Sequence, residues 1–167
     1  VTVQGEKLVN LTGGGVSNLA SRSLREQQVF CTDIDGDGVT EVPSPVLMNG
    51  YPQGSNSEFY YIEWLAYSDQ GFLVKEITYI NSSDGYQLRV PSEWKDMVFV
   101  KTTSDQDEVQ FLCRNADGSE GDELLRIRTV QKTDLVQTGL TQGFFKLASV
   151  GQITYLAKLN IETESIY

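Results

Sequence analysis

The feature that constrains the fold most is a pair of strand-like segments separated by a short turn. Residues 59–67 are almost all aromatic or branched, and residues 72–80 repeat this composition after the turn at 68–71. Aromatic and β-branched residues favour strands, and Gly71 can supply the left-handed turn residue that a tight hairpin needs. The two segments therefore predict a β-hairpin, the nucleus of an antiparallel sheet.

The same pattern continues to the C-terminus, where short apolar segments alternate with clusters of Gly, Asn, Asp and Ser. Two segments favour short helices: 92–97, which follows Pro91, and 132–140, with Thr133 as its cap. We therefore expect a mainly β to α+β fold, an antiparallel sheet of successive hairpins with one or two short helices. The further predicted strands are residues 86–90, 97–102, 108–113, 123–130, 144–150 and 153–159.

The first 58 residues differ from the rest of the chain. They contain loop-like stretches, and residues 43–55 carry three of the four prolines. Proline cannot donate to a strand ladder and often marks a connection. The sequence thus predicts a small N-terminal lobe over residues 1–48, a linker over 49–58, and an antiparallel β-rich body over 59–167.

Charge excludes several classes of function. The chain has 13 Lys and Arg against 23 Asp and Glu, a net charge of −10, and it has no histidine. An acidic surface repels the phosphates of nucleic acids and anionic lipid headgroups. The lack of histidine excludes Ser-His and Cys-His catalysis and His-ligated metals within this chain. No apolar run exceeds four residues, whereas a membrane-spanning helix needs about 20.

One short segment carries a metal-ligand pattern. Between residues 33 and 41, oxygen-bearing side chains occur at positions 1, 3, 5 and 9, and Gly38 occupies position 6. Ca²⁺ binds six to eight hard oxygen ligands, and a glycine at position 6 allows the loop to turn sharply around the ion. The predicted Ca²⁺ ligands are Asp33, Asp35, Asp37, the carbonyl of Val39, and Glu41.

The loop is not a complete EF-hand. Position 12 is Ser44 rather than a glutamate, and Pro43 and Pro45 prevent a regular exiting helix. Residues 33–41 instead resemble the Asp-x-Asp-Gly-Asp-Gly-x-x-Asp/Glu calcium loop of FG-GAP/VCBS repeats. The following Val42 and Pro43 are similar to the continuation of this loop in bacterial lipoproteins. The resemblance implies bound Ca²⁺ and an extracytoplasmic location, and one copy fits the last fragment of a repeat region.

A second resemblance lies in the predicted β-rich body. Gly85, Tyr86, Pro91 and Trp94 stand at the spacing of the Gly-Tyr…Pro-x-x-Trp opening of PsbP-like domains. That resemblance implies a curved antiparallel sheet packed against helices, in a module used for binding or assembly. The residues alone also fit a strand that ends at Pro91, followed by Trp94 as part of the core.

These observations favour a non-enzymatic extracytoplasmic domain of unassigned role. Its partner would be another protein or a glycan of the cell envelope. The chain begins at Val1 without a leader-like segment, so we expect a mature or trimmed portion, with any signal peptide or lipid-anchor cysteine lying before it. Cys31 and Cys113 fit either a disulfide or two buried thiols.

Two alternative functions stay open at this point. A carbohydrate- or cell-wall-binding module would use exposed aromatic rings from the segment 59–67 to stack on sugars. A carboxylate-based hydrolase would use two acidic side chains at a fixed separation. The candidate aromatic residues are Phe59, Tyr60, Tyr61, Trp64 and Tyr67, and the candidate carboxylates are Glu58, Glu63 and Glu76.

Overall fold

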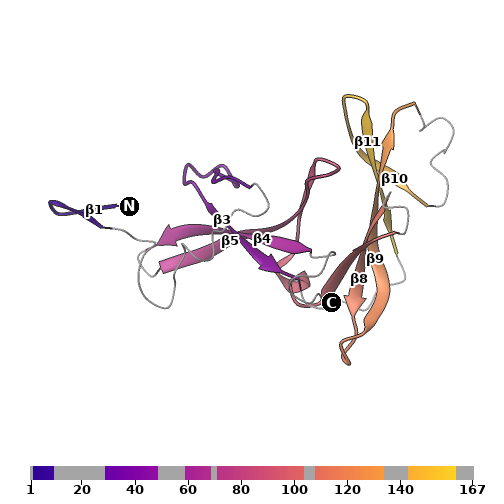
Figure 1. Cartoon of the computed structure of the whole chain (residues 1–167), viewed down its shortest axis with the longest axis horizontal. Coiled ribbons are helices and arrows are strands. Elements are labelled where there is room, and N and C mark those ends of the chain that lie inside the picture. Colours follow the sequence, from indigo (N-terminus) through magenta and orange to yellow (C-terminus); the bar gives the residue numbers. More distant parts are fainter. Residues whose placement is uncertain are drawn as a thin grey trace. The chain divides into compact units, whose positions relative to one another are not determined.

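The structure, a computed structural model, describes residues 2–9, 29–48, 59–68, 71–103, 108–133 and 143–160 of the chain. The chain divides into two compact units, of which the first comprises Val1–Leu47 with Tyr60–Ser92 and the second comprises Met48–Phe59 with Glu93–Tyr167. Each unit has its own antiparallel sheet (Figure 1). The described part of the fold is therefore mainly β, as the sequence predicts.

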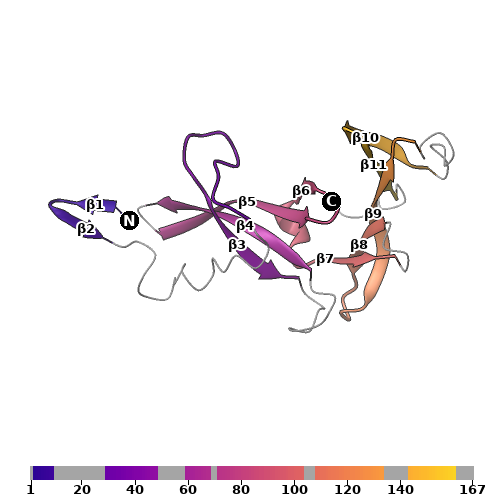
Figure 2. The same ribbon diagram turned by 45° about the horizontal axis from the view of Figure 1, so that its top comes forward.

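The first unit contains a four-stranded sheet in the order β3-β4-β5-β6 (Figure 2). The predicted hairpin is confirmed: β4 and β5 are paired antiparallel, and Gly71 has a φ of 109° beside the turn. A separate two-stranded hairpin lies near the N-terminus. The strands of this unit are β1 (Thr2–Gln4), β2 (Lys7–Val9), β3 (Val42–Leu47), β4 (Tyr60–Ser68), β5 (Gly71–Asn81) and β6 (Tyr86–Arg89).

Pairing of β3 with β4 joins residues from both sides of the expected linker 49–58 in one sheet. Val42 lies opposite Leu65, and the pairing continues to Leu47 opposite Tyr60. The last strand of the expected lobe 1–48 therefore belongs to the same sheet as the start of the expected body. The expected linker 49–58 lies outside the described residues. The expected body is itself divided between the two compact units, because Tyr60–Ser92 belongs to the first and Glu93–Tyr167 to the second.

The centre of the first sheet is β4. Residues 61–66 are all buried, and because successive side chains of a strand point to opposite faces, both faces of this strand are covered. Trp64 is only 2% exposed, and its indole Nε1 donates a hydrogen bond of 2.9 Å to Oγ1 of Thr78 on β5. The aromatic segment that predicts the hairpin thus also forms the core of this unit.

The second unit contains a five-stranded sheet in the order β10-β11-β9-β8-β7. Strands β7, β8 and β9 follow one another as a meander, whereas β11 pairs with both β9 and β10. Val100, Phe111 and Leu156 are among its most deeply buried side chains. The strands are β7 (Val98–Thr102), β8 (Glu108–Arg114), β9 (Glu120–Gln131), β10 (Phe145–Val150) and β11 (Ile153–Leu159).

The helix expected at 92–97 is shorter than predicted. The structure has a single 3₁₀ turn, η1 (Ser92–Trp94), and the N–H of Met97 donates to the carbonyl of Trp94. The chain then enters β7 at Val98, so strand pairing leaves no room for a longer helix. The helix expected at 132–140 lies largely outside the described residues. Within the described ranges, no helix has the length and apolar character to span a membrane.

The two cysteines carry thiols in the structure rather than a disulfide. Cys31 is exposed and belongs to the first unit, so the expectation of two buried thiols is wrong for this residue. Cys113 is half-buried on β8 of the second unit. Burial, with a smaller effect from the negative charge of Asp122, raises the pKa of the Cys113 thiol.

Candidate metal centre

The loop that carries the acidic pattern is closed at its base by backbone pairing. The N–H of Glu41 donates to the carbonyl of Thr32 at 2.9 Å, and the N–H of Thr32 donates back at 3.3 Å. This isolated antiparallel bridge holds both ends of the loop. Because β3 begins at Val42, the closed loop is attached directly to the edge strand of the first sheet.

The carboxylate of Asp33 holds the interior of the loop in shape. Its Oδ1 accepts hydrogen bonds from the N–H groups of Gly36 (2.7 Å) and Asp37 (3.1 Å), and its Oδ2 accepts from Gly38 (2.9 Å). Gly36 and Gly38 have φ angles of 78° and 86°, in the left-handed region that glycine adopts at little cost. These two glycines allow the backbone to curl around the side chain of Asp33.

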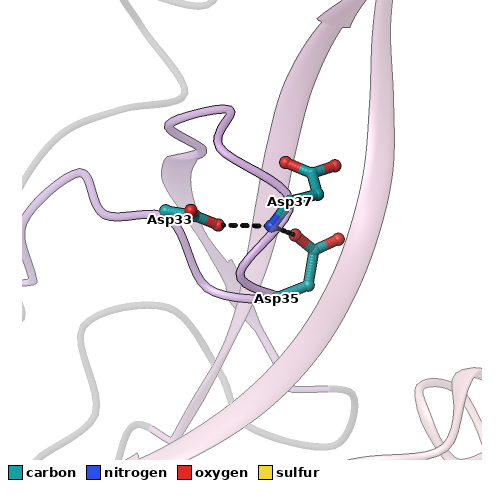
Figure 3. A group of neighbouring side chains, drawn as sticks. All are labelled: Asp33, Asp35 and Asp37. Carbon is teal, nitrogen blue, oxygen red and sulfur yellow. Dashed lines mark hydrogen bonds between the residues drawn. The ribbon is translucent and has the colours of Figure 1, made fainter.

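The curl brings three carboxylates together. One oxygen from each of Asp33, Asp35 and Asp37 lies within 4.8 Å of the others, and all three residues are exposed (Figure 3). The N–H of Asp37 donates to both other side chains, at 3.1 Å to Asp33 and 3.2 Å to Asp35. Three carboxylates this close repel one another unless a positive charge compensates them. The cluster can therefore bind a metal ion.

Glu41 provides a second feature at the base of this loop. Its side chain is fully buried, at 0% exposure, and Oε2 accepts a hydrogen bond of 3.0 Å from the N–H of Ile34 inside the loop. The other oxygen, Oε1, is buried and accepts no hydrogen bond from the described residues. A polar oxygen without a hydrogen-bond partner is costly to bury. Glu41 lies outside the group of three aspartates, but its carboxylate end contacts the same loop.

Val39 is held in the loop by its backbone. Its N–H donates to Oδ1 of Asp37 at 2.8 Å. The side chain is exposed, which fits a residue whose predicted contribution is only a carbonyl oxygen. Of the five predicted ligands, the structure brings Asp33, Asp35 and Asp37 into one cluster, and it connects Glu41 and Val39 to that cluster through the loop backbone.

Sequence reasoning missed one charged residue of this site. Nζ of Lys75, on β5, lies 2.7 Å from Oδ2 of Asp37 and 3.2 Å from Oδ2 of Asp35. The hydrogen bond from Lys75 is the largest cause that lowers the pKa of Asp37 below its ordinary value. The same contacts, led by the one to Asp37, raise the pKa of Lys75 above its ordinary value of 10.5.

The aromatic residues proposed for sugar binding are largely used in the core. Trp64 and Tyr61 are buried, and Phe59 and Tyr60 are half-buried. Tyr67 alone among these five is exposed, at 45%, and its ring makes an edge contact with Phe72 at 5.6 Å. The expected platform of exposed Tyr and Trp rings is therefore wrong for Trp64.

Among the carboxylates proposed for hydrolysis, the two that the structure describes, Glu63 and Glu76, do not form a pair. Glu63 lies opposite Ile77 in the strand register, whereas Glu76 lies opposite Trp64. Neighbouring positions of a strand point to opposite faces, so Glu63 and Glu76 point away from each other across the sheet. Glu76 also forms an ion pair of 2.6 Å with Arg89. Glu58 lies outside the described residues.

No family model, curated protein or solved structure matches the chain. The acidic loop, with its curled backbone, its three clustered aspartates and the buried Glu41, is the part of the described chain with the clearest capacity for chemistry. A functional proposal therefore depends on the residues of this loop.

Proposed function

We propose that residues 33–41 bind a structural Ca²⁺ ion, in a non-enzymatic extracytoplasmic domain that serves binding or assembly. The observation that carries the proposal is the buried Oε1 of Glu41, which has no hydrogen-bond partner among the described residues and belongs to the loop of three clustered aspartates. A cation at the loop would compensate both the orphaned oxygen and the repulsion among the aspartates.

The donor set favours Ca²⁺ over other common metals. Every candidate ligand is an oxygen, from a carboxylate or from the carbonyl of Val39, and the chain has no histidine. Oxygen ligands suit hard cations, whereas zinc and copper prefer sites with imidazole or thiolate groups. Ca²⁺ also tolerates irregular geometry with six to eight oxygens, while Mg²⁺ demands a near-ideal octahedron. A curled loop with exposed aspartates therefore fits Ca²⁺ better than Mg²⁺.

The bound ion would stabilise the fold rather than take part in a reaction. The carboxylates of Asp33, Asp35, Asp37 and Glu41 bring four negative charges, so one Ca²⁺ changes the local sum from −4 to −2. Because Glu41 is paired with Thr32 and is followed directly by β3, an ion held by Glu41 would fix the loop to the edge of the sheet. Extracellular Ca²⁺ modules bind with dissociation constants of about 10⁻⁴–10⁻³ M, which fits an exposed site and an extracytoplasmic location.

Thermal unfolding with and without metal tests the proposal. Adding Ca²⁺ to the chelated protein should raise Tm, because an ion that binds only the folded state contributes about 2.7 kcal/mol at one hundred times its dissociation constant. The variant Asp35→Ala should lose this response. Asp117→Ala is the matched control, because Asp117 is also exposed and accepts hydrogen bonds from its own turn, through Ser119. A melting curve that does not change between chelator and Ca²⁺ in the unmodified protein would contradict the proposal.

A further inference from the structure

The ammonium group of Lys75 occupies the oxygens that a metal ion would need. Oδ1 of Asp35 accepts from the N–H of Asp37, and Oδ1 of Asp37 accepts from the N–H of Val39. The remaining oxygen of each aspartate, Oδ2, contacts Nζ of Lys75, at 3.2 Å for Asp35 and 2.7 Å for Asp37. The two carboxylate oxygens not used by the loop backbone are thus both paired with Lys75.

A β-bulge places Lys75 in this position. In the pairing of β4 with β5, Trp64 lies opposite Glu76 and the next residue, Leu65, lies opposite Val74. Lys75 is therefore the extra residue of the bulge, because no residue of β4 lies opposite it in the register. A bulge breaks the strict alternation of a strand and turns the direction of a side chain. Here the side chain at the bulge meets a loop 38 positions earlier in the sequence.

We propose that Lys75 is a built-in competitor of the metal ion: it compensates part of the negative charge of the loop when no metal is bound, leaves Asp35 and Asp37 when a divalent cation binds, and so sets the affinity of the site. This inference rests on the proposed Ca²⁺ site and adds its regulation. With Lys75 in place, the four carboxylates and one ammonium sum to −4 + 1 = −3. A divalent ion on the same oxygens provides twice the charge of the ammonium at a shorter distance.

The side chain of Lys75 suits such an exchange. It is partly exposed, at 32%, so a released ammonium group can enter solvent without a burial cost. Its four-carbon stem is flexible, and its strongly hydrated charge is stable in water. The exchange involves the end of the side chain, because Nζ makes the ion pairs with both aspartates.

Calorimetric titration with Ca²⁺ alone tests the competition. Lys75→Met should bind Ca²⁺ about tenfold more tightly than the unmodified protein, equal to about 1.4 kcal/mol, because the ion no longer displaces a charge. Arg89→Met is the matched control: it also removes one positive charge from this sheet, but Arg89 is paired with Glu76. This control should change the affinity less than about twofold, as expected for a charge screened by salt and solvent.

The outcomes separate the two proposals. If the unmodified protein binds Ca²⁺ and Lys75→Met binds it with the affinity of Arg89→Met, the competition is wrong and the Ca²⁺ site stands. If neither the unmodified protein nor Lys75→Met binds Ca²⁺ at millimolar concentration, the site itself is wrong and the competition falls with it. If Lys75→Met binds Ca²⁺ more tightly than the unmodified protein and Arg89→Met does not, both proposals are supported.

A measurement on the unmodified protein makes the test independent of any variant. The side-chain CH₂ resonances of Lys75 next to Nζ should shift during a Ca²⁺ titration and should saturate together with the backbone resonances of the loop. Lys101, which is paired with Glu120 in the second unit, serves as the internal reference and should not shift. Resonances of Lys75 that stay unchanged while the loop saturates would overturn the displacement.

Discussion

Nζ of Lys75 lies 2.7 Å from Oδ2 of Asp37, so an ion pair links strand β5 to a loop 38 positions earlier in the sequence. The contact ties the acidic loop to a strand that does not adjoin it along the chain. The ammonium group also compensates part of the repulsion among the three clustered aspartates. The ion pair therefore has a measurable role in the metal-free protein.

The contribution of this ion pair to stability should depend on pH. Folding lowers the pKa of Asp37 below its ordinary value of 3.8. The stabilising contribution of Asp37 is therefore complete above pH 3.8 and is lost as the pH falls through the pKa of the folded state. The pKa of Lys75 is raised from 10.5, so its contribution is present below that value and is lost at still higher pH. In chelator, the Tm difference between the unmodified protein and Lys75→Met should thus be constant from about pH 5 to 9 and shrink below the ordinary pKa of Asp37.

Salt provides the control for that measurement. Both groups are exposed to solvent, so about 1 M NaCl should reduce the Tm difference across the whole plateau. A Tm difference that instead grows as the pH falls below 3.8 would contradict the sign derived from the lowered pKa of Asp37.

Glu41→Gln should have opposite effects with and without Ca²⁺. In chelator, the substitution removes one of the four acidic groups of the loop and so reduces the repulsion among them, which should stabilise the protein by about 1 kcal/mol. With Ca²⁺, it removes a proposed ligand and should abolish the rise in stability. Urea unfolding in the two buffers measures both effects, and the exposed Glu93→Gln serves as control. A Glu41→Gln protein that is less stable in chelator and still responds to Ca²⁺ would be inconsistent with the site.

The left-handed backbone of the loop gives a third prediction. Gly38 has a φ of 86°, and a Cβ added there would meet no atom within 4 Å, so Gly38→Ala would add backbone strain without a clash. The expected cost is about 1–2 kcal/mol, with a smaller cost for Gly38→Asn because asparagine tolerates this region better. Urea unfolding of both variants in Ca²⁺ should give that order. Equal stability of Gly38→Ala and the unmodified protein would show that the loop does not need this conformation.

Local patterns predicted much of this fold. The composition of residues 59–67 and 72–80 indicates β4 and β5 because strand propensity and turn residues act over a few positions. The spacing of Asp33, Asp35 and Asp37 likewise predicts a cluster, since a curled loop brings alternate side chains together. In both cases the residues that determine the structure are close in the sequence.

Features set by long-range pairing could not be predicted in this way. Lys75 reaches the loop only because a bulge shifts the register of β5, and no property of the loop sequence indicates that shift. The pairing of β3 with β4, on either side of residues 49–58, similarly puts the end of the expected lobe and the start of the expected body in one sheet. Trp64 shows the same limit: an aromatic residue in a strand fits a core or a sugar platform, and only its burial decides between them.

The hydrogen bond between Trp64 and Thr78 gives the last prediction. Nε1 of Trp64 donates to Oγ1 of Thr78 at 2.9 Å, and both side chains are buried. Thr78→Val keeps the shape of the side chain but leaves the indole N–H without its acceptor, so we expect a loss of about 1–3 kcal/mol in unfolding free energy. Urea unfolding followed by tryptophan fluorescence measures this loss.

A double-mutant cycle separates the hydrogen bond from general packing. Trp64→Phe removes the donor, so Thr78→Val in that background should cost less than in the unmodified protein, with a coupling energy of about 1 kcal/mol or more. Thr102→Val on β7 controls for replacing a strand threonine, because Thr102 is exposed. Equal costs of Thr78→Val in the two backgrounds would mean that the hydrogen bond does not stabilise the sheet and that burial alone positions Trp64.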